Sequence, residues 1–229
     1  MIKLLLKRLV QYGAWARIGN LLAVVLVLNL TVNAASAETV TIAAFGDSLT
    51  QGYGLPDGDG LVPQLQVWLE TAGQDVKLVN MGVSGDTTAG GLARIDWTLT
   101  DEIKALIVEL GGNDILRGLP PTESRRNLEG ILQAAAVRGL PVLLVGMQAP
   151  GNYGADYKQD FDAIYPDLAA QYNTLLFPVY LAPILDGRSF ADALKAFMQA
   201  DGIHPNKAGV GLIVPVIGPY VVDLVGKIE

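Results

Sequence analysis

The sequence predicts one α/β domain, a three-layer α/β/α sandwich in which helices cover both faces of a sheet of about five parallel strands. Two patterns support this fold class. Short runs that are apolar throughout, rather than alternating with polar residues, indicate strands buried on both faces. These runs alternate with longer amphipathic stretches, an order that is typical of a parallel sheet. The 229 residues show no internal repeat or linker and suit a single domain.

Each predicted element follows from one of these two patterns, taken in chain order. The predicted strands are the apolar runs VTIAAF (40–45), VKLVN (76–80), ALIVEL (105–110), PVLLVG (141–146) and TLLFPVY (174–180). The predicted helices are the longer amphipathic stretches near 61–72, 88–99, 122–138, 157–171, 190–199 and 206–226.

The first 37 residues form a pattern of their own, which predicts a signal peptide. Residues 1–20 hold four basic side chains and no acid, residues 21–30 (LLAVVLVLNL) are almost wholly apolar, and Ala35-Ser36-Ala37 offers small residues at a cleavage site. The apolar run is about half the ~20 residues that a membrane-spanning helix needs. We expect cleavage after Ala37, export to the periplasm or the medium, and a catalytic domain at 38–229 without stable membrane insertion. An uncleaved N-terminal anchor is the alternative.

Charge and composition exclude several classes of function. Removing the leader takes four of the 16 basic residues and none of the 23 acids, so the mature chain has 12 basic and 23 acidic residues and a net charge of −11. Such an acidic chain without a basic cluster is a poor partner for nucleic acid or anionic membranes. The chain has no cysteine, which excludes disulfides, thiol catalysis and thiolate metal sites.

Polar clusters follow the predicted strands, where the loops of a parallel sheet meet at its carboxyl edge and bind ligands. These clusters are Gly46-Asp47-Ser48 after the first strand, Gly82 to Thr88 after the second, Gly111 to Asp114 after the third, and Asp201 to His204 before the last helix. The clusters are distant in sequence, and the topology allows them to converge in space.

Ser48 is the candidate nucleophile. It follows Asp47 directly after a strand and can open a helical turn, so that its backbone N–H points outward where anions bind. The ordinary alternative is that Asp47 or Ser48 only caps a helix. A phosphate-binding P-loop is excluded because no Gly-Lys-Ser/Thr follows at the required spacing.

His204 is the only histidine, and it lies three residues after Asp201 in ADGIHPNKAG. A carboxylate at that spacing can accept the imidazole Nδ1–H, which leaves Nε2 free to take a proton from a hydroxyl. Pro205 biases His204 away from helical geometry and keeps it on a constrained loop. The alternative is a surface histidine beside an incidental acid. A zinc site is disfavoured because a single histidine without cysteine offers too few ligands.

Gly85 and Asn113 are candidate oxyanion donors. Acyl transfer places negative charge on a carbonyl oxygen, and preorganised donors must meet it. Gly85 has no Cβ and can bring its N–H close to a ligand, whereas Asn113 offers a neutral side-chain N–H. A turn glycine and an Asx-turn are the structural alternatives.

With these residues in view, the chain resembles the SGNH hydrolases, the GDSL esterase/lipase family. The four family blocks occur in order as FGDSLTQGYG, NMGVSGDTTAGGLAR, VELGGNDILRG and DGIHPN. The segments GNYGADY (151–157) and IYPDL (164–168) are similar to an exported bacterial branch described as acyl-CoA thioesterase, arylesterase and lysophospholipase.

This resemblance implies a flavodoxin-like α/β/α fold, and it implies roles for the candidate residues. Ser48 is the expected nucleophile, His204 the general base and then acid, and Asp201 the residue that orients His204. The backbone N–H groups of Ser48 and Gly85 and the side chain of Asn113 form the expected oxyanion hole. No cofactor and no metal are expected, and the expected partners are small-molecule acyl esters or thioesters.

The resemblance also places an acyl groove beside the segment MQAPGNYGADY (147–157), with Ala149, Pro150 and Tyr153 as candidate substrate contacts. A merely connecting loop is the alternative for each of them. Two other functions stay open at this point. One is a carbohydrate O-acetylesterase that uses the same residues, and the other is a non-catalytic module that binds a phosphate or flavin at the carboxyl edge of the sheet.

Overall fold

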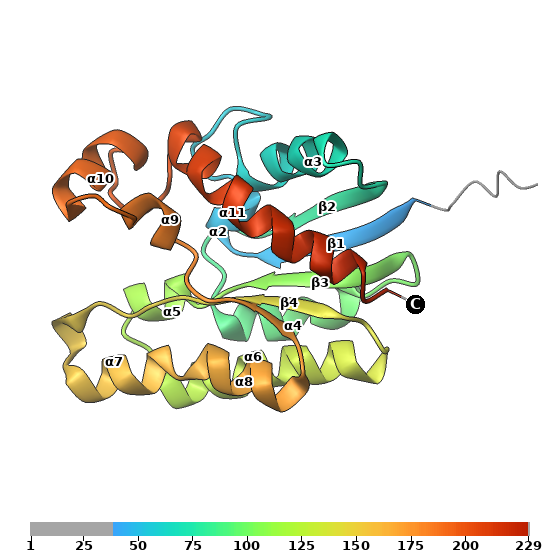
Figure 1. Ribbon diagram of the computed structural model, residues 1–229. Helices are drawn as coiled ribbons and strands as arrows, with labels where there is room; N and C mark the ends of the chain where they lie inside the picture. The colour runs from blue at the N-terminus through green and yellow to red at the C-terminus, as the bar shows by residue number, and fades with distance from the viewer. Residues whose placement is uncertain (1–38, 229) are drawn as a thin grey trace, which may run out of the picture. The chain divides into compact units, whose positions relative to one another are not determined.

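The computed structural model describes residues 39–228, and these form one α/β unit (Figure 1). Residues 1–37, for which a signal peptide is predicted, lie outside the described residues. The strands are β1 (Val40–Gly46), β2 (Val76–Gly82), β3 (Ile103–Glu109), β4 (Val142–Val145) and β5 (Leu175–Phe177). The strands form a single sheet in the order β2-β1-β3-β4-β5, and every neighbouring pair is parallel.

Two layers of helices enclose the sheet, so the predicted three-layer sandwich is confirmed. One layer holds α3 (Leu61–Thr71), α9 (Ala182–Leu185), α10 (Phe190–Phe197) and α11 (Lys207–Val225). The other holds α4 (Thr88–Thr98), α6 (Pro121–Val137), α7 (Ala155–Asp162) and α8 (Ile164–Tyr172) (Figure 1). Two further short helices, α2 (Ser48–Gln51) and α5 (Gly112–Leu116), follow strands directly.

Burial explains why the strands read as continuous apolar runs. In the central strands β1 and β3, side chains on both faces are covered, since Ile42, Phe45 and Leu106 are 0% exposed and Ile107 is 3% exposed. Each such side chain contributes about 1.5–3 kcal/mol when it leaves water. β2 lies at the edge of the sheet, and its pattern alternates, with Val76 and Leu78 buried and Lys77 exposed between them.

Helix α11 packs closely on α3. A Cβ at Gly218 would lie 2.4 Å from the ring of Trp68, so the close approach of the two helices requires glycine there. By length and hydropathy α11 also suits a membrane span, a property that buried core helices share. Here its apolar face packs against α3, β4 and β5.

The predicted helix at 157–171 is wrong in one respect, because two helices occupy it. α7 ends at Asp162 and α8 begins at Ile164, with Ala163 between them. Pro166 has no backbone N–H, so it cannot continue the hydrogen-bond ladder of α7, and it lies instead in the first turn of α8 where that N–H is not needed. Pro178 similarly limits β5, which ends at Phe177 rather than continuing to residue 180.

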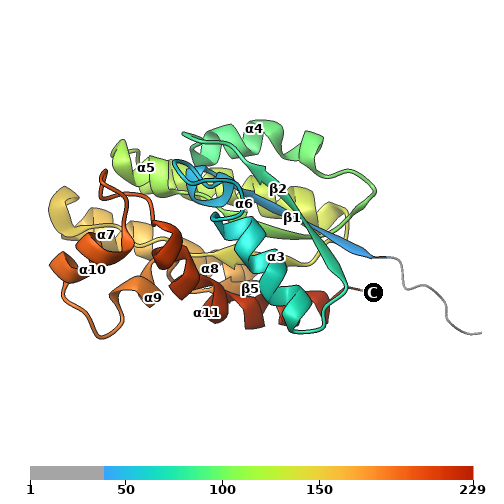
Figure 2. The same cartoon turned by 90° about the horizontal axis from the view of Figure 1, so that it is seen from above.

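The carboxyl ends of all five strands lie at one edge of the sheet, as parallel pairing requires. Seen from above, α2, α5, α7 and α10 gather at this edge, opposite the end at which the chain enters β1 (Figure 2). The predicted convergence of the polar clusters is therefore possible, and the side chains decide whether it occurs.

Candidate active site

Ser48 begins α2 at the carboxyl end of β1. The chain turns sharply because Asp47 caps the helix, with its Oδ1 accepting the Leu49 N–H at 3.0 Å. The helix is only four residues long and ends at Gly52, whose φ of 91° belongs to the left-handed region that favours glycine. Ser48 is 9% exposed, so its hydroxyl sits at the floor of the loops rather than on an open surface.

The loop before α11 brings His204 and Asp201 to this hydroxyl. His204 Nε2 lies 2.8 Å from Ser48 Oγ, across 156 residues of sequence. His204 Nδ1 lies 2.7 Å from Asp201 Oδ2. The structure therefore brings the three sequence-predicted side chains into one hydrogen-bonded row of carboxylate, imidazole and hydroxyl.

Asp201 is held by its own loop. Its Oδ1 accepts the backbone N–H groups of Ile203 at 2.9 Å and His204 at 3.1 Å, while Oδ2 faces the imidazole. Burial acts to raise the pKa of Asp201, but the hydrogen bonds from the His204 ring and the two backbone N–H groups outweigh it, so the pKa lies below 3.8. Asp201 consequently stays ionised and keeps the imidazole in the tautomer with Nδ1 protonated.

Gly85 lies on the loop that follows β2, beside α2. Ser84 Oγ donates to Gln51 Oε1 of α2 at 2.9 Å, and Arg117 Nη2 donates to the Gly85 carbonyl at 2.8 Å. Gly85 has φ 85°, a conformation that other residues rarely adopt. Its loop is thus fixed both to the helix that carries Ser48 and to the end of α5.

Arg94 holds the start of the same loop. From α4 its Nε forms an ion pair with Asp86 at 2.6 Å, and its Nη1 and Nη2 donate to the carbonyls of Met81 and Gly46, each at 2.9 Å. The guanidinium also stacks 3.9 Å over the centre of the Phe45 ring. One side chain therefore ties the ends of β1 and β2 together, just before the residues that face the site.

Asn113 comes to the site from α5, which begins directly after β3. Gly111, with φ 121°, makes the turn between strand and helix. The Asn113 Nδ2 donates one hydrogen to Asp47 Oδ2 at 3.1 Å. A side-chain amide has two such hydrogens, so the second is available to a ligand beside Ser48.

Two carboxyl groups are buried directly behind the nucleophile. Asp47 and Glu109 are each 1% exposed, and Glu109 Oε2 accepts the Thr50 hydroxyl at 2.7 Å while its Oε1 has no partner among the described residues. Burial raises the pKa of Asp47 from 3.8 to about 6, partly offset by the hydrogen bonds from Leu49 and Asn113. Burial, followed by the charge of Asp47, raises the pKa of Glu109 well above 4.5.

This pair predicts that stability falls as pH rises. Because both pKa values are higher in the folded than in the unfolded chain, the folded state binds more protons above pH ~4, and raising the pH weakens folding. We expect Glu109→Gln, which keeps the acceptor for Thr50, to increase the free energy of unfolding by about 1–3 kcal/mol at pH 8 and by less at pH 5. Urea unfolding at both pH values measures this. Glu102→Gln, at an exposed position before β3, is the matched control, and equal effects of the two substitutions would contradict the prediction.

Asp114, the neighbour of Asn113, is also buried, but both of its carboxyl oxygens have hydrogen-bond partners. It is 1% exposed, and its Oδ2 accepts the Thr88 N–H at 2.8 Å while its Oδ1 accepts the hydroxyls of Thr88 at 2.6 Å and Ser124 at 2.9 Å. These contacts join α5 to the first turns of α4 and α6. Asp114 thereby fixes the helix on which Asn113 stands.

Removing Asp114 is expected to cost stability. Hydrogen bonds to a charged group contribute about 1.5–3 kcal/mol each, so Asp114→Ala should lower the free energy of unfolding by roughly 3 kcal/mol or more. Asp160→Ala, which removes an exposed carboxylate from α7, should change it by less than ~0.5 kcal/mol. Denaturant unfolding of both variants compares them, and an Asp114→Ala protein as stable as Asp160→Ala would contradict the structural role.

The three candidate substrate contacts differ in exposure. Tyr153 lies in the short 3-10 helix Gly151–Tyr153, is 42% exposed, and packs its ring 5.0 Å from that of Tyr157. Pro150 is also exposed. Ala149 is 2% exposed, and its backbone is held by Asp162 and Lys158, so its side chain belongs to the core rather than to a surface that could meet substrate.

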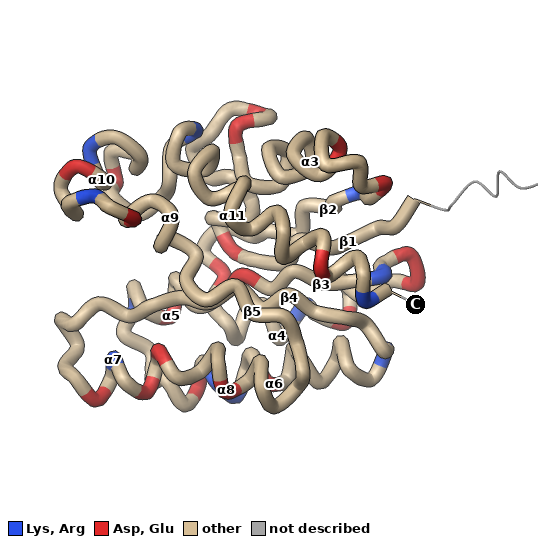
Figure 3. The backbone as a smooth tube through the Cα atoms, in the orientation of Figure 1, with Lys and Arg blue, Asp and Glu red and all other residues tan. Residues whose placement is uncertain are grey.

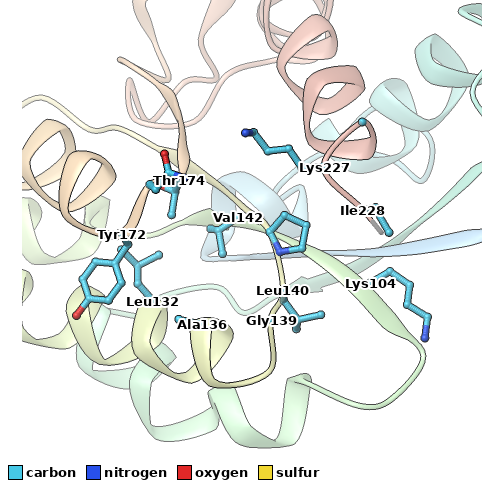
Figure 4. A pocket seen from close by; sticks show the side chains of 13 residues that line it. Lys104, Leu132, Ala136, Gly139, Leu140, Val142, Tyr172, Thr174, Lys227 and Ile228 are labelled. Carbon is cyan, nitrogen blue, oxygen red and sulfur yellow. The ribbon is translucent and has the colours of Figure 1, made fainter.

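Two cavities of the fold lie apart from the row of Ser48, His204 and Asp201. A cavity of about 660 Å³ lies at the opposite edge of the sheet, where β4 begins at Val142, and it is also lined by Lys227 and Ile228, which follow α11 (Figure 4). Another of about 610 Å³ lies beside β5 and α9. None of the three residues lines either cavity.

Charge is spread over the fold. Figure 3 shows Lys and Arg distributed along the tube among the more numerous acids. Within residues 39–228, no group of three or more His, Asp or Glu residues is arranged to hold a metal ion.

The sequence pointed to Ser48, Gly85, Asn113, Asp201 and His204, and it placed Asp47 and Asp114 in the same polar clusters without assigning them the contacts that support the site. Asp47, Glu109, Arg94 and Asp114 each act through contacts with residues distant in sequence. Glu109 could have been noticed in the sequence, because it is a charged residue at the end of the apolar run ALIVE.

Comparisons with known proteins agree with this geometry. The model of the GDSL-like lipase/acylhydrolase family matches residues 44–212. Esterase TesA of Pseudomonas aeruginosa is 42% identical over 186 residues, which cover 81% of this chain and 88% of TesA. Thioesterase 1/protease 1/lysophospholipase L1 of Escherichia coli K12 is 37% identical over 182 residues, covering 78% and 80%.

A solved structure gives the same result. AlinE4, described as an SGNH-hydrolase family esterase, superposes with a TM-score of 0.66 at 44% identity, covering 82% of this chain and 97% of AlinE4. The match of sequence, fold and block order leads to one assignment. The chain belongs to the GDSL-like lipase/acylhydrolase family, the SGNH hydrolases, and is a carboxylic ester hydrolase.

Proposed function

We propose that the protein is a serine hydrolase that cleaves carboxylic esters and thioesters through a Ser48-His204-Asp201 triad and an acyl-enzyme intermediate. The observation that supports this best is the hydrogen-bonded row, with Ser48 Oγ 2.8 Å from His204 Nε2 and His204 Nδ1 2.7 Å from Asp201. This is the arrangement in which an imidazole can take a proton from a hydroxyl while a carboxylate stabilises the resulting imidazolium.

The reaction proceeds in two halves. Ser48 Oγ attacks the carbonyl carbon of the substrate while its proton passes to His204 Nε2. His204 then returns this proton to the departing alcohol or thiol, which leaves an ester between the acyl group and Ser48. A water molecule then attacks that ester while its proton passes to His204. The tetrahedral intermediate collapses as His204 returns the proton to Ser48 Oγ, which releases the carboxylic acid and restores the serine.

The negative charge of each tetrahedral intermediate requires donors that are already in position. We assign this role to the backbone N–H groups of Ser48 and Gly85 and to the free hydrogen of Asn113 Nδ2. Three features support the assignment. Ser48 is at the first position of a helix, the Gly85 loop is attached to that helix through Ser84, and Asn113 is oriented by Asp47.

The substrate class rests on the relatives. Esterase and thioesterase names occur among them, so we propose that this chain hydrolyses both kinds of acyl compound, with Pro150 and Tyr153 contacting the acyl chain. A site on loops suits several acyl groups, so we expect activity on short to medium chains. Carbohydrate O-acetyl hydrolysis uses the same residues and is the alternative outcome.

A substrate panel tests the proposal. The protein beginning at residue 38 is assayed with p-nitrophenyl butyrate, phenyl acetate, an acyl-CoA and acetylated xylan, with Ser48→Ala as the control. Turnover of the first three, abolished by the substitution, is the expected result. Release of acetate from xylan alone would favour the O-acetylesterase, and an inactive protein that binds FMN would favour the non-catalytic module.

Processing of the leader is a separate proposal. We propose that residues 1–37 direct export and are removed, leaving 38–229 as the catalytic domain. Expression of the full chain in a Gram-negative host, followed by fractionation and intact-mass analysis, measures this directly. A product that begins at Glu38 outside the cytoplasm is expected, and a full-length product retained in the membrane would support the uncleaved anchor.

A further inference from the structure

Gln199 connects two segments that the proposed catalytic residues occupy. It lies just after α10, in the turn that leads to His204. Its backbone N–H donates to the His204 carbonyl at 2.7 Å, and its side-chain Nε2 donates to the Pro205 carbonyl at 3.1 Å. Gln199 thus holds two consecutive carbonyl groups of the backbone, those of His204 and Pro205.

The same Nε2 reaches the segment of the nucleophile. It donates to the Tyr53 carbonyl at 2.8 Å, across 146 residues of sequence. Tyr53 directly follows Gly52, the end of α2, and its ring lies 4.8 Å from the His204 ring at a tilt of 40°. One amide group therefore bridges the helix turn that carries Ser48 and the loop that carries His204.

Gly54 is shaped to admit this bridge. Its φ of 74° lies in the left-handed region, and a Cβ there would come within 2.2 Å of Gln199 Oε1. A flexible side chain can move away from such a clash, but Gln199 would then leave its two carbonyl partners. Gly54, at the end of the FGDSLTQGYG block, is therefore needed for the Gln199 bridge as well as for the turn.

Few other contacts set the separation of the two segments. Within the described part of the chain, hydrogen bonds between residues 48–54 and residues 198–206 are those of Gln199 to Tyr53 and of His204 to Ser48. The bridge of Met198 to Pro205 and the bonds of Asn206 to Ala196 and Met198 stay within the His204 segment. Without Gln199, the catalytic hydrogen bond would be the remaining hydrogen bond between these two described segments, beside the packing of the Tyr53 ring on the His204 ring.

We propose that Gln199 is a positioning residue, which fixes His204 against Ser48 by tying the carbonyls of Tyr53 and Pro205 together, and that Gly54 provides the space for it. The inference rests on the proposed roles of Ser48 and His204. Proton transfer is sensitive to such positioning, because a misplacement of about 1 Å can reduce turnover about 10²-fold.

The test compares Gln199→Ala and Gln199→Glu with the wild-type protein. The glutamate keeps the length of the side chain but cannot donate to two carbonyls, so both variants should behave alike. We expect kcat for p-nitrophenyl butyrate to fall about 10–100-fold with KM changed less than about twofold. The rate at which diethyl p-nitrophenyl phosphate modifies Ser48 should fall in parallel, because that reaction needs the nucleophile and base but no acyl groove.

Gln66→Ala is the matched control. Gln66 also bridges two segments, with Nε2 donating to the Val76 carbonyl at 2.9 Å and Oε1 accepting the Leu78 N–H at 2.8 Å, but it does so between α3 and β2, at the start of that strand. Its loss should lower the Tm as much as the loss of Gln199 or more, and leave kcat unchanged. A kcat that falls equally in both variants would show a general structural effect and overturn the proposal.

A double-variant cycle tests the partnership with Gly54. If the clash with Gln199 causes part of the defect of Gly54→Ala, the double variant Gly54→Ala/Gln199→Ala should be faster than the product of the single effects predicts. Independent effects would overturn this part of the proposal. Should Gly54→Ala fail to fold, the two Gln199 variants still decide the main claim.

The outcomes separate this inference from the proposed function. If Ser48→Ala is inactive but Gln199→Ala keeps wild-type kcat and wild-type modification of Ser48, only the role of Gln199 is overturned. If Ser48→Ala retains activity, the proposed triad itself fails.

Discussion

We expect Ser48→Ala and His204→Ala each to lower kcat for p-nitrophenyl butyrate by about 10⁴-fold or more, and the double variant to be no slower than the slower single one. The reason is that in the proposed mechanism the two side chains act as one unit. A hydroxyl without its base is a weak nucleophile, and an imidazole without the hydroxyl has no proton to take. The 2.8 Å contact between Ser48 Oγ and His204 Nε2 is where this unit is formed.

Steady-state kinetics of the three variants provide the measurement, with folding checked by circular dichroism. Ser189→Ala is the control for loss of a serine hydroxyl, since Ser189 is exposed and its hydroxyl bonds to Asp192 at the start of α10. We expect it to change kcat by less than about tenfold. Multiplicative losses in the double variant would show that Ser48 and His204 contribute independently, which the proposed mechanism does not allow.

The fold could be predicted from the sequence because its strongest signal is physical and local. Strands covered on both faces must be apolar on both sides, and Ile42 and Phe45 in β1 and Leu106 and Ile107 in β3 fulfil this condition. Parallel pairing then requires all strand ends to meet at one edge, so polar residues after strands are expected to converge. The main error, the helix predicted at 157–171, arose because a break of one residue at Ala163 leaves the helical periodicity almost intact.

The supporting residues of the site could not be predicted in the same way. Glu109 meets Thr50 across 59 residues, and Gln199 meets Tyr53 across 146. No periodicity connects such pairs, and a glutamine after a helix or a charged residue at the end of a strand has many possible roles. Their functions become visible only when distances and burial are known.

The orientation of the Asn113 side chain depends on Asp47. Asp47 is buried, and its Oδ2 accepts one hydrogen of the Asn113 amide at 3.1 Å, which fixes the plane of the amide and leaves the other hydrogen for the substrate. Asp114 also holds α5 through its hydrogen bonds to Thr88 and Ser124, so the Asn113 amide has little freedom to move. A donor that is already in place costs no reorganisation when the oxyanion forms.

Asn113→Ala should therefore lower kcat about 10²–10³-fold with little change in KM, because the lost hydrogen bond is made mainly in the transition state. Asn127→Ala is the matched control. It removes a buried amide that donates to Thr88 Oγ1 at 3.1 Å, so it should lower stability and leave kcat within about threefold. Steady-state kinetics and urea unfolding of both variants separate the two effects. If Asn113→Ala instead raised KM with kcat intact, Asn113 would bind the ground state, and the oxyanion would have to rely on the N–H groups of Ser48 and Gly85.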